Sequence, residues 1–269
     1  MPELPEVETV TQSVKKHLKG NSFSSIQVNW KKVLDNFDLS DYRRDVKSKK
    51  IIDVYRRAKY IIIDFKDVIL AVHLRMTGKL YVSDSINKKN KHISLCIKMK
   101  NKYLIFEDTR KFGRFYLYSD MKYLNNKLGI EPLSKEFTTK WILDNMNSRK
   151  RQIKSLLFDQ SFICGLGNIY IDEALWYAKI HPLSISNSIS KRKILSLHKG
   201  IIKVLKTSIK QGGTTIRDYT YDFKYVGNYA INLNVFAREG KNCSRCNSVI
   251  IKNKISQRGT HFCPKCQKL

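Results

Sequence analysis

The chain begins with a residue that can act as a nucleophile, Pro2, followed by a carboxylate, Glu3. Once the initiator Met1 is removed, Pro2 carries a secondary amine at the end of the chain, and a terminal amine has an ordinary pKa of about 8. Such an amine needs only a small downward shift to attack as a neutral nucleophile, and Glu3 lies within reach of whatever it attacks. The terminus therefore predicts covalent catalysis, which a retained Met1 would block.

Two pairs of cysteines near the other end of the chain have the spacing of a metal site. The pairs are Cys243-x2-Cys246 and Cys263-x2-Cys266, and two such knuckles typically hold one tetrahedral zinc ion through four thiolates. A closed site of this kind leaves no position for substrate, so we expect one structural Zn2+. Metal binding would also supply folding free energy that so small a module lacks.

The residues behind the terminus predict a helix that would hold it in place. A proline at position 5 and acids at positions 6 and 8 favour a helix start. Apolar residues then recur every three to four positions, at Val7, Val10, Val14 and Leu18. A helix start explains Pro5, Glu6 and Glu8, but it does not require Pro2 and Glu3.

The first half of the chain is typical of short strands joined by turns. β-Branched and aromatic residues alternate with charged ones from Phe23 to Phe65. Further strands are expected at Val68–Arg75, Lys79–Val82, His92–Met99, Tyr103–Glu107 and Phe115–Tyr118. Consecutive short strands predict a sandwich or a barrel.

From about residue 135 the pattern becomes helical. Helices are expected at Arg149–Phe158, Asn168–Ala178 and Lys191–Lys210. The second is preceded by Gly165-Leu166-Gly167, whose glycines permit the close approach of a ligand. Because a helix start offers free backbone N–H groups, this position predicts a phosphate site.

The composition indicates a polyanionic partner. The formal net charge is +28, from 51 Lys and Arg against 23 Asp and Glu, which favours nucleic acid or an anionic membrane surface. No apolar run is long enough to span a bilayer, and no secretory leader is present. We therefore expect an intracellular protein whose cysteines bind metal rather than form disulfides.

Five separate stretches resemble one family. They are Met-Pro-Glu-Leu-Pro-Glu-Val-Glu-Thr at 1–9, Arg-Arg-Ala-Lys-Tyr at 56–60, Asp-Thr-Arg-Lys-Phe-Gly at 108–113, Gly-Asn-Ile-Tyr-Ile-Asp-Glu-Ala-Leu at 167–175, and the four cysteines. Together they resemble the formamidopyrimidine-DNA glycosylases, base-excision repair enzymes that remove oxidised purines and then cleave the strand. Asn247 departs from the family, in which glycine usually follows the first knuckle; asparagine tolerates the positive φ that this position needs.

The resemblance implies catalytic roles for four residues. Pro2 would be the nucleophile, and Glu3 would help to protonate the sugar oxygen. Lys59 would bind phosphate and donate a proton during strand cleavage. Arg258 would hold a phosphate beside the lesion and act in the last elimination step.

The resemblance also implies a set of DNA contacts. Met76 and Phe112 would fill the gap that an extruded base leaves, and Arg110 would hydrogen-bond the estranged cytosine. Asn168 would hold a phosphate flanking the lesion. Further contacts are expected from His73, His92, Lys150 and Lys154, the last two lying towards the DNA.

The fold class that the resemblance implies is α+β. It has an N-terminal β-sandwich domain flanked by helices (1–130), a helical domain with a helix-two-turn-helix motif (131–230) and a C-terminal zinc finger (231–269), with a segment at 214–229 covering the flipped base. The partner would be double-stranded DNA that contains oxidised bases or abasic sites. We expect a monomer with no membrane partner, located in the cytoplasm of a bacterium and associated with the nucleoid.

Two alternative functions stay open. An endonuclease VIII-type enzyme would share the fold but act on oxidised pyrimidines, although Leu4, Val7 and the triplet Arg110-Lys111-Phe112 favour the purine type. A zinc-containing protein that binds DNA without catalysis would explain the charge and the cysteines, but it would not require Pro2.

Overall fold

A computed structural model describes residues 2–214 and 229–269, which form two compact units. Of the described residues, the first unit comprises 2–126 together with 212–214, and the second comprises 127–211 and 229–269. The three expected domains, with boundaries at 130 and 230, stay a prediction. No helix in the described ranges combines the length and the apolar character that crossing a membrane requires.

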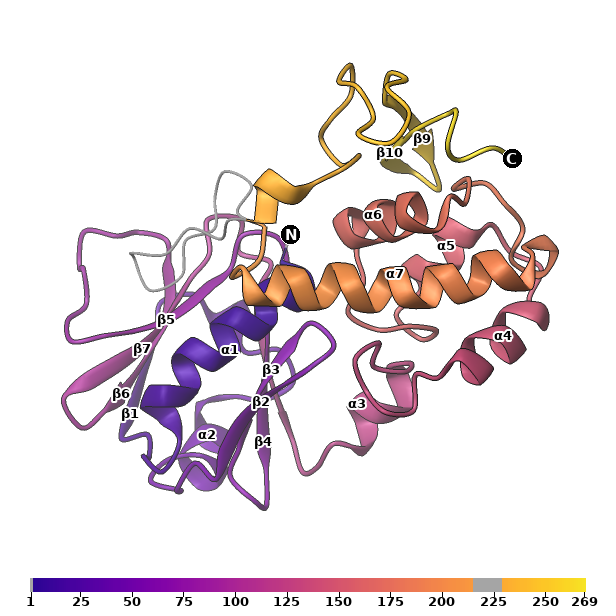
Figure 1. The fold of residues 1–269 in the computed structure, drawn as a ribbon. Coiled ribbons are helices and arrows are strands. Elements are labelled where there is room, and N and C mark those ends of the chain that lie inside the picture. The colour runs from indigo at the N-terminus through magenta and orange to yellow at the C-terminus, as the bar shows by residue number, and fades with distance from the viewer. Residues whose placement is uncertain (1, 215–228) are drawn as a thin grey trace. The chain divides into compact units, whose positions relative to one another are not determined.

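The first unit contains two four-stranded sheets (Figure 1). One sheet has the order β1-β6-β7-β5 and the other β2-β3-β4-β8, and all neighbouring strands are antiparallel. The strands are β1 (Ser25–Val28), β2 (Asp53–Arg57), β3 (Tyr60–Asp64), β4 (Ile69–His73), β5 (Lys79–Ser83), β6 (Ile93–Met99), β7 (Lys102–Glu107) and β8 (Arg114–Tyr118).

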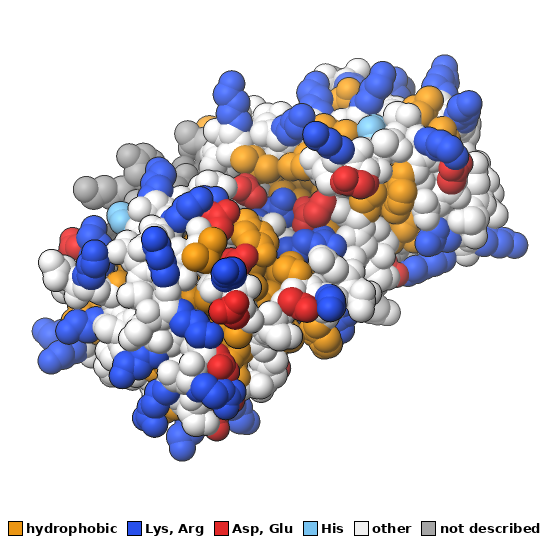
Figure 2. Space-filling view, turned by 90° about the horizontal axis from the view of Figure 1, so that it is seen from below, with side chains coloured by type: hydrophobic (Ala, Val, Ile, Leu, Met, Phe, Trp, Pro, Cys, Tyr) orange, Lys and Arg blue, Asp and Glu red, His pale blue; other side chains and the backbone are white. Residues whose placement is uncertain are grey.

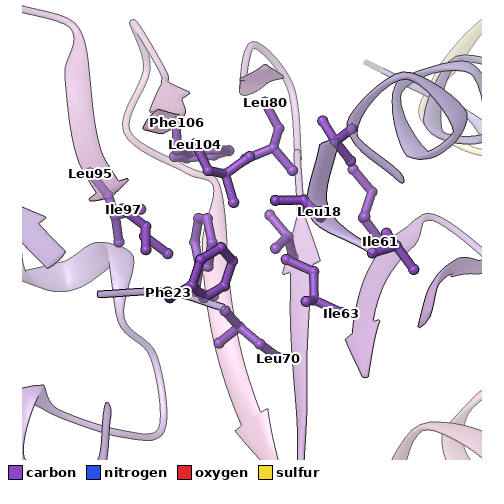
Figure 3. Packing of buried hydrophobic residues seen from close by; sticks show 14 of the residues in the cluster. Leu18, Phe23, Ile61, Ile63, Leu70, Leu80, Leu95, Ile97, Leu104 and Phe106 are labelled. Atoms are coloured by element: carbon purple, nitrogen blue, oxygen red, sulfur yellow. The ribbon is translucent and has the colours of Figure 1, made fainter. Parts of the chain in front are cut away.

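A single apolar core joins the two sheets and the first helix, α1 (Leu4–Leu18). Figure 3 shows Leu18 of α1 in one cluster with Ile61 and Ile63 of one sheet and Leu80 and Phe106 of the other. The apolar positions of α1 that the sequence singled out are all buried. Each such side chain contributes roughly 1.5–3 kcal/mol, so the helix behind the chain terminus is firmly held.

The second unit is helical and ends in a small hairpin. Its helices are α4 (Thr139–Asn147), α5 (Ile153–Phe158), α6 (Asn168–Ala178) and α7 (Lys191–Lys210), and its hairpin is β9 (Ile251–Ile255) with β10 (Arg258–Phe262). Short helices α2 (Leu39–Asp45) and α3 (Lys122–Lys127) lie earlier in the chain, and single 3-10 turns occur at Lys31–Val33, Ser186–Ser188 and Tyr229–Asn232. The expected α+β class, with its two-sheet domain, helical part and terminal cysteine module, is confirmed.

Two local expectations were wrong. The strand-like stretch from 23 to 65 contains helix α2, because Asp38 caps it by accepting hydrogen bonds from the backbone of Ser40 and Asp41. The helix expected from position 149 starts only at Ile153. Residues 149–152 instead pair with residues 185–186: the Ser186 N–H donates to the Arg151 carbonyl over 2.8 Å.

Candidate active site and zinc site

The chain terminus is held by two buried glutamates. Glu3 is the N-cap residue of α1, and it forms a capping box with Glu6, whose Oε2 accepts the backbone N–H of Glu3 over 2.9 Å. Glu3 is 2% exposed and Glu6 is 5% exposed, and Pro2 is buried beside them. The structure therefore fixes the position of the residue that we expect to carry the reactive amine.

The second oxygen of Glu6 binds a distant part of the same unit. Its Oε1 accepts the backbone N–H of Thr214 over 2.7 Å. The preceding Gly213 has φ +87°, and a Cβ on it would lie 2.9 Å from the same oxygen, so only glycine fits there without strain. Glu6 thus ties the terminus to the start of the segment expected to cover the flipped base; residues 215–228 of that segment lie outside the described residues.

Lys59 is presented by a tight turn between β2 and β3. Ala58 has φ +53°, and the Arg56 guanidinium donates to its carbonyl over 3.0 Å. Arg56 also forms an ion pair with Glu8 of α1 over 2.8 Å. Because the arginine binds both elements, the turn that carries Lys59 is fixed relative to the helix that carries the terminus.

The two expected base-gap residues are large apolar side chains exposed on loops. Met76 is 40% exposed and Phe112 is 46% exposed. Their exposure leaves both side chains available for insertion between bases. The Arg110 guanidinium lies 4.8 Å from the centroid of the Phe112 ring, which brings the expected cytosine reader beside one wedge.

One carboxylate that the sequence did not single out organises both of these loops. Asp108 is fully buried, and it accepts the backbone N–H groups of Phe112 and Gly113 over 2.8 and 2.7 Å. It also accepts the Thr77 hydroxyl and the Arg110 N–H. An aspartate directly before a basic loop was the available signal, but its partner Thr77, 31 positions earlier, could not be identified from the sequence.

The two expected histidine contacts differ in their surroundings. His92 is half-buried at the start of β6, and its carbonyl accepts the Asp108 N–H over 2.9 Å. His73 is buried: desolvation, followed by the nearby charges of Arg75 and Lys59, lowers its pKa to about 3. Its Nδ1 accepts the Arg75 N–H over 3.0 Å, so the structure favours a positioning role for His73 over the expected phosphate contact.

In the second unit, α6 brings Asn168 and Arg258 into one neighbourhood. Asn168 is the first residue of α6, and its Nδ2 donates over 2.8 Å to the carbonyl of Gly259, which follows Arg258 in the hairpin. Its Oδ1 is buried and has no hydrogen-bond partner among the described residues. Arg258 is exposed and lies 4.9 Å from the Phe158 ring centroid of α5. Lys150 is exposed as well.

Lys154 does not lie on the surface where the sequence placed it. Its side chain is 1% exposed, and its Nζ lies 2.6 Å from Oδ1 of the fully buried Asp172 in α6. The other oxygen of Asp172 accepts the backbone N–H of His261 over 2.9 Å. Because this carboxylate neutralises the lysine inside the unit, Lys154 supports the hairpin rather than facing DNA.

The four cysteines form one cluster. Their sulfur atoms all lie within 4.8 Å of one another, close to the separation of about 3.8 Å that Zn–S bonds of about 2.3 Å give in a tetrahedron. Trp176 of α6 donates its indole N–H to Cys243 Sγ over 3.5 Å. Asn247 has φ +59°, which confirms that asparagine adopts the backbone of the usual glycine. The residues fit one structural zinc ion.

We expect the Lys154→Met substitution to lower the free energy of unfolding by about 3–5 kcal/mol, because it leaves the buried Asp172 carboxylate without its cation. The exposed Lys150→Met serves as the matched control and should change stability by less than about 0.5 kcal/mol. The double change Lys154→Met, Asp172→Asn should recover much of the loss. Urea titrations measure all three, and equal losses at 150 and 154 would contradict the burial of Lys154.

His73 should make the protein sensitive to acid. Its folded-state pKa lies below the ordinary value of 6.5, so its contribution to stability is present above that value and is lost as the pH falls towards 3. Between pH 7.5 and pH 4 the loss amounts to about 3 kcal/mol. The His73→Asn variant keeps an acceptor for the Arg75 N–H. Its free energy of unfolding, measured by urea titration, should fall less steeply as the pH is lowered. An unchanged dependence on pH would refute a neutral His73.

Chelation should remove one zinc ion per chain and alter the fluorescence of Trp176, because its indole N–H donates to a zinc-binding sulfur. The change in emission should disappear in Trp176→Phe, whereas Trp30 and Trp141 serve as internal references. Metal analysis and emission spectra give the two readouts. Loss of zinc with unaltered Trp176 emission would show that the indole does not contact the zinc site.

The comparisons with known proteins cover the whole chain. Residues 1–115 match the formamidopyrimidine-DNA glycosylase N-terminal domain, residues 128–220 its H2TH domain, and residues 240–269 a zinc finger found in FPG and IleRS. The chain is 42% identical to the formamidopyrimidine-DNA glycosylase of Protochlamydia amoebophila and 39% identical to that of Pelotomaculum thermopropionicum. Each alignment covers the full length of this chain and of the relative.

Solved structures of similar fold belong to the same family as these relatives. A Lactococcus lactis FPG mutant in complex with Fapy-dG-containing DNA has a TM-score of 0.93 at 37% identity, and MutM in complex with DNA containing carbocyclic 8-oxo-G has 0.92 at 38%; both cover the full length of each chain. The chain belongs to the formamidopyrimidine-DNA glycosylase family.

Proposed function

We propose that this protein is a bifunctional DNA glycosylase and abasic-site lyase that excises oxidised purines, 8-oxoguanine and formamidopyrimidines, from duplex DNA. The observation that carries the proposal is the buried terminus, where Pro2 directly precedes Glu3 and the capping box fixes Glu3 at the start of α1. The relatives named above support the substrate class, because their DNA contains Fapy-dG or an 8-oxo-G analogue.

The reaction begins at the amine of Pro2. Its lone pair forms a bond to C1′ of the damaged nucleoside, and the base leaves with the electron pair of the glycosidic bond and takes up the proton that the nitrogen loses. Glu3 then protonates O4′, and the C1′–O4′ bond breaks as the nitrogen lone pair forms a double bond to C1′. A secondary amine then yields an iminium ion, which cannot be neutralised by losing a proton from nitrogen. The step therefore leaves a covalent link between protein and DNA.

Strand cleavage follows from the same intermediate. The iminium ion makes the C2′ proton acidic; its removal expels the 3′ phosphate, and a second elimination expels the 5′ phosphate. Lys59 and Arg258 are the cations we assign to these phosphates, and Asn168 to a flanking one. The zinc ion would hold the hairpin through the four cysteines, as a structural element.

Recognition of the lesion rests on the loops that Asp108 organises. Met76 and Phe112 would occupy the space of the flipped base, and Arg110 would bind the estranged cytosine with the rigid fork of its guanidinium. The basic surface supplies affinity independent of sequence; in Figure 2, Lys and Arg side chains are spread widely over the face shown. The relatives are bacterial, so we place the protein on the chromosome in a bacterial cytoplasm.

Borohydride should trap the protein covalently on a duplex that contains 8-oxoguanine opposite cytosine. In Pro2→Gly the trapping rate should fall by at least about 100-fold, because the secondary amine is lost. Gel electrophoresis measures the crosslink, and intact mass first establishes that Met1 has been removed.

The Glu3→Gln variant separates the two steps. It should lose base release, yet it should still form an adduct on a preformed abasic site, where no base has to leave. A wild-type protein that binds the duplex tightly and never crosslinks would support the non-catalytic alternative. Preference for oxidised pyrimidines over 8-oxoguanine would support the endonuclease VIII type.

A further inference from the structure

Helix α7 carries a narrow row of cations on its exposed side. The helix contains seven Lys and Arg and no acid. Five of them follow a spacing of seven, four, three and four residues, which places them along one line of an α-helix. These five, the basic row, are Arg192, Lys199, Lys203, Lys206 and Lys210, and all are exposed.

The basic row is not neutralised by the protein itself. Among the described residues, no carboxylate lies within ion-pair distance of any of its five cations. The amine of Lys203 lies 5.3 Å from the ring centroid of Tyr177. Among the described residues, this cation–π contact is the only electrostatic interaction that Lys203 makes with a side chain. Unpaired like charges repel one another, so a polyanion bound along the row would relieve that repulsion.

The row lies on the exposed side of α7, opposite the side that is buried in the second unit. The opposite side of α7 is buried and packs on α6: the hydroxyl groups of Ser208 and Tyr170 are 2.6 Å apart. Asn168 begins α6, and Arg258 stands in the hairpin that α6 supports. Both residues therefore lie on the α6 side of α7, whereas the cations of the row extend from its exposed side, from which Lys203 reaches the Tyr177 ring.

A hollow next to the row adds a further cation. It has a volume of about 420 Å³, and its charged lining is Lys203 of α7, Arg245 and the carboxylate of Glu173. Glu173 already accepts the backbone N–H groups of Asn234, Val235 and Phe236. The Arg245 guanidinium is stacked 3.7 Å from the Trp176 ring centroid. The two cations outnumber the one carboxylate, so the hollow favours a phosphate group.

The geometry suits a nucleic-acid backbone. From position 192 to position 210 the row extends for about 27 Å, and a B-form duplex of that length carries about 16 phosphates. The apolar side chains of α7 are buried in the unit, so the helix has no face to insert into a membrane. The row also lacks the aromatic and apolar anchors that protein interfaces use.

We propose that the basic row of α7 binds the backbone of a second segment of duplex DNA while the first segment occupies the lesion site. This proposal rests on the proposed function, which supplies the first segment. Holding two segments would let the protein pass directly from one stretch of DNA to another during its search. Contacts of this kind would be independent of sequence and sensitive to salt.

The test uses protein trapped by borohydride on a lesion duplex and then purified. A fluorescent undamaged duplex is added, and its anisotropy is followed at several salt concentrations. The row variant carries Lys199→Gln, Lys203→Gln, Lys206→Gln and Lys210→Gln. The control variant removes the same charge from four exposed lysines of the first unit, through Lys31→Gln, Lys32→Gln, Lys47→Gln and Lys50→Gln.

We expect the trapped wild type to bind the second duplex and the row variant to bind it at least tenfold more weakly. The slope of log affinity against log salt should become shallower by up to about 3.6, for four lost phosphate contacts. The control should change affinity much less, and single-turnover excision should be the same in all three proteins.

Three results would overturn the proposal. They are equal losses in the row and control variants, no binding of a second duplex to the wild type, and binding of polyglutamate to the row in place of DNA. If trapping itself fails, the proposed function fails, and sedimentation of free protein with excess duplex decides the proposal instead. Two duplexes per chain that fall to one in the row variant would support it, and one duplex throughout would refute it.

Discussion

The paired hydrogen bonds of Glu6 are the interaction on which the catalytic unit depends. A chain terminus ordinarily frays, because few contacts hold it. Here one oxygen of Glu6 binds the backbone of Glu3, and the other binds the backbone of Thr214, more than 200 residues further along the chain. An amine can attack from the end of the chain only if that end is fixed, so Glu6 turns the least constrained part of a protein into a defined position.

In the second unit, helix α6 fixes the position of the segment that contains the four cysteines. Three of its side chains, spaced four residues apart and hence on one face, each bind the cysteine module. Asn168 donates to the Gly259 carbonyl, Asp172 accepts the His261 N–H, and Trp176 donates to Cys243. The hairpin that carries Arg258 is thereby held at two points and the first cysteine pair at a third. The buried charge of Asp172 is tolerated because Lys154 balances it.

Much of the architecture and the zinc site could be predicted from the sequence, whereas the catalytic and DNA-contact residues stay predictions. Strands, the first helix and the cysteine cluster follow from local patterns, since periodicity and spacing report on neighbours in the chain. The burial of Lys154 could not be predicted, because a lysine in a basic stretch looks the same whether or not an aspartate 18 residues later meets it inside the unit. Asp108 escaped notice for the same reason, since its partner Thr77 lies in a different loop.

The claim that unites these features is that the amine of Pro2 itself becomes bonded to the sugar. Proteolysis of the borohydride-reduced complex, followed by mass mapping of the peptide that carries the nucleotide, tests this directly. The account predicts that the adduct is found on the N-terminal peptide, at Pro2, with Met1 absent. An adduct on Lys59 or on any other lysine, with an unmodified N-terminal peptide, would contradict it.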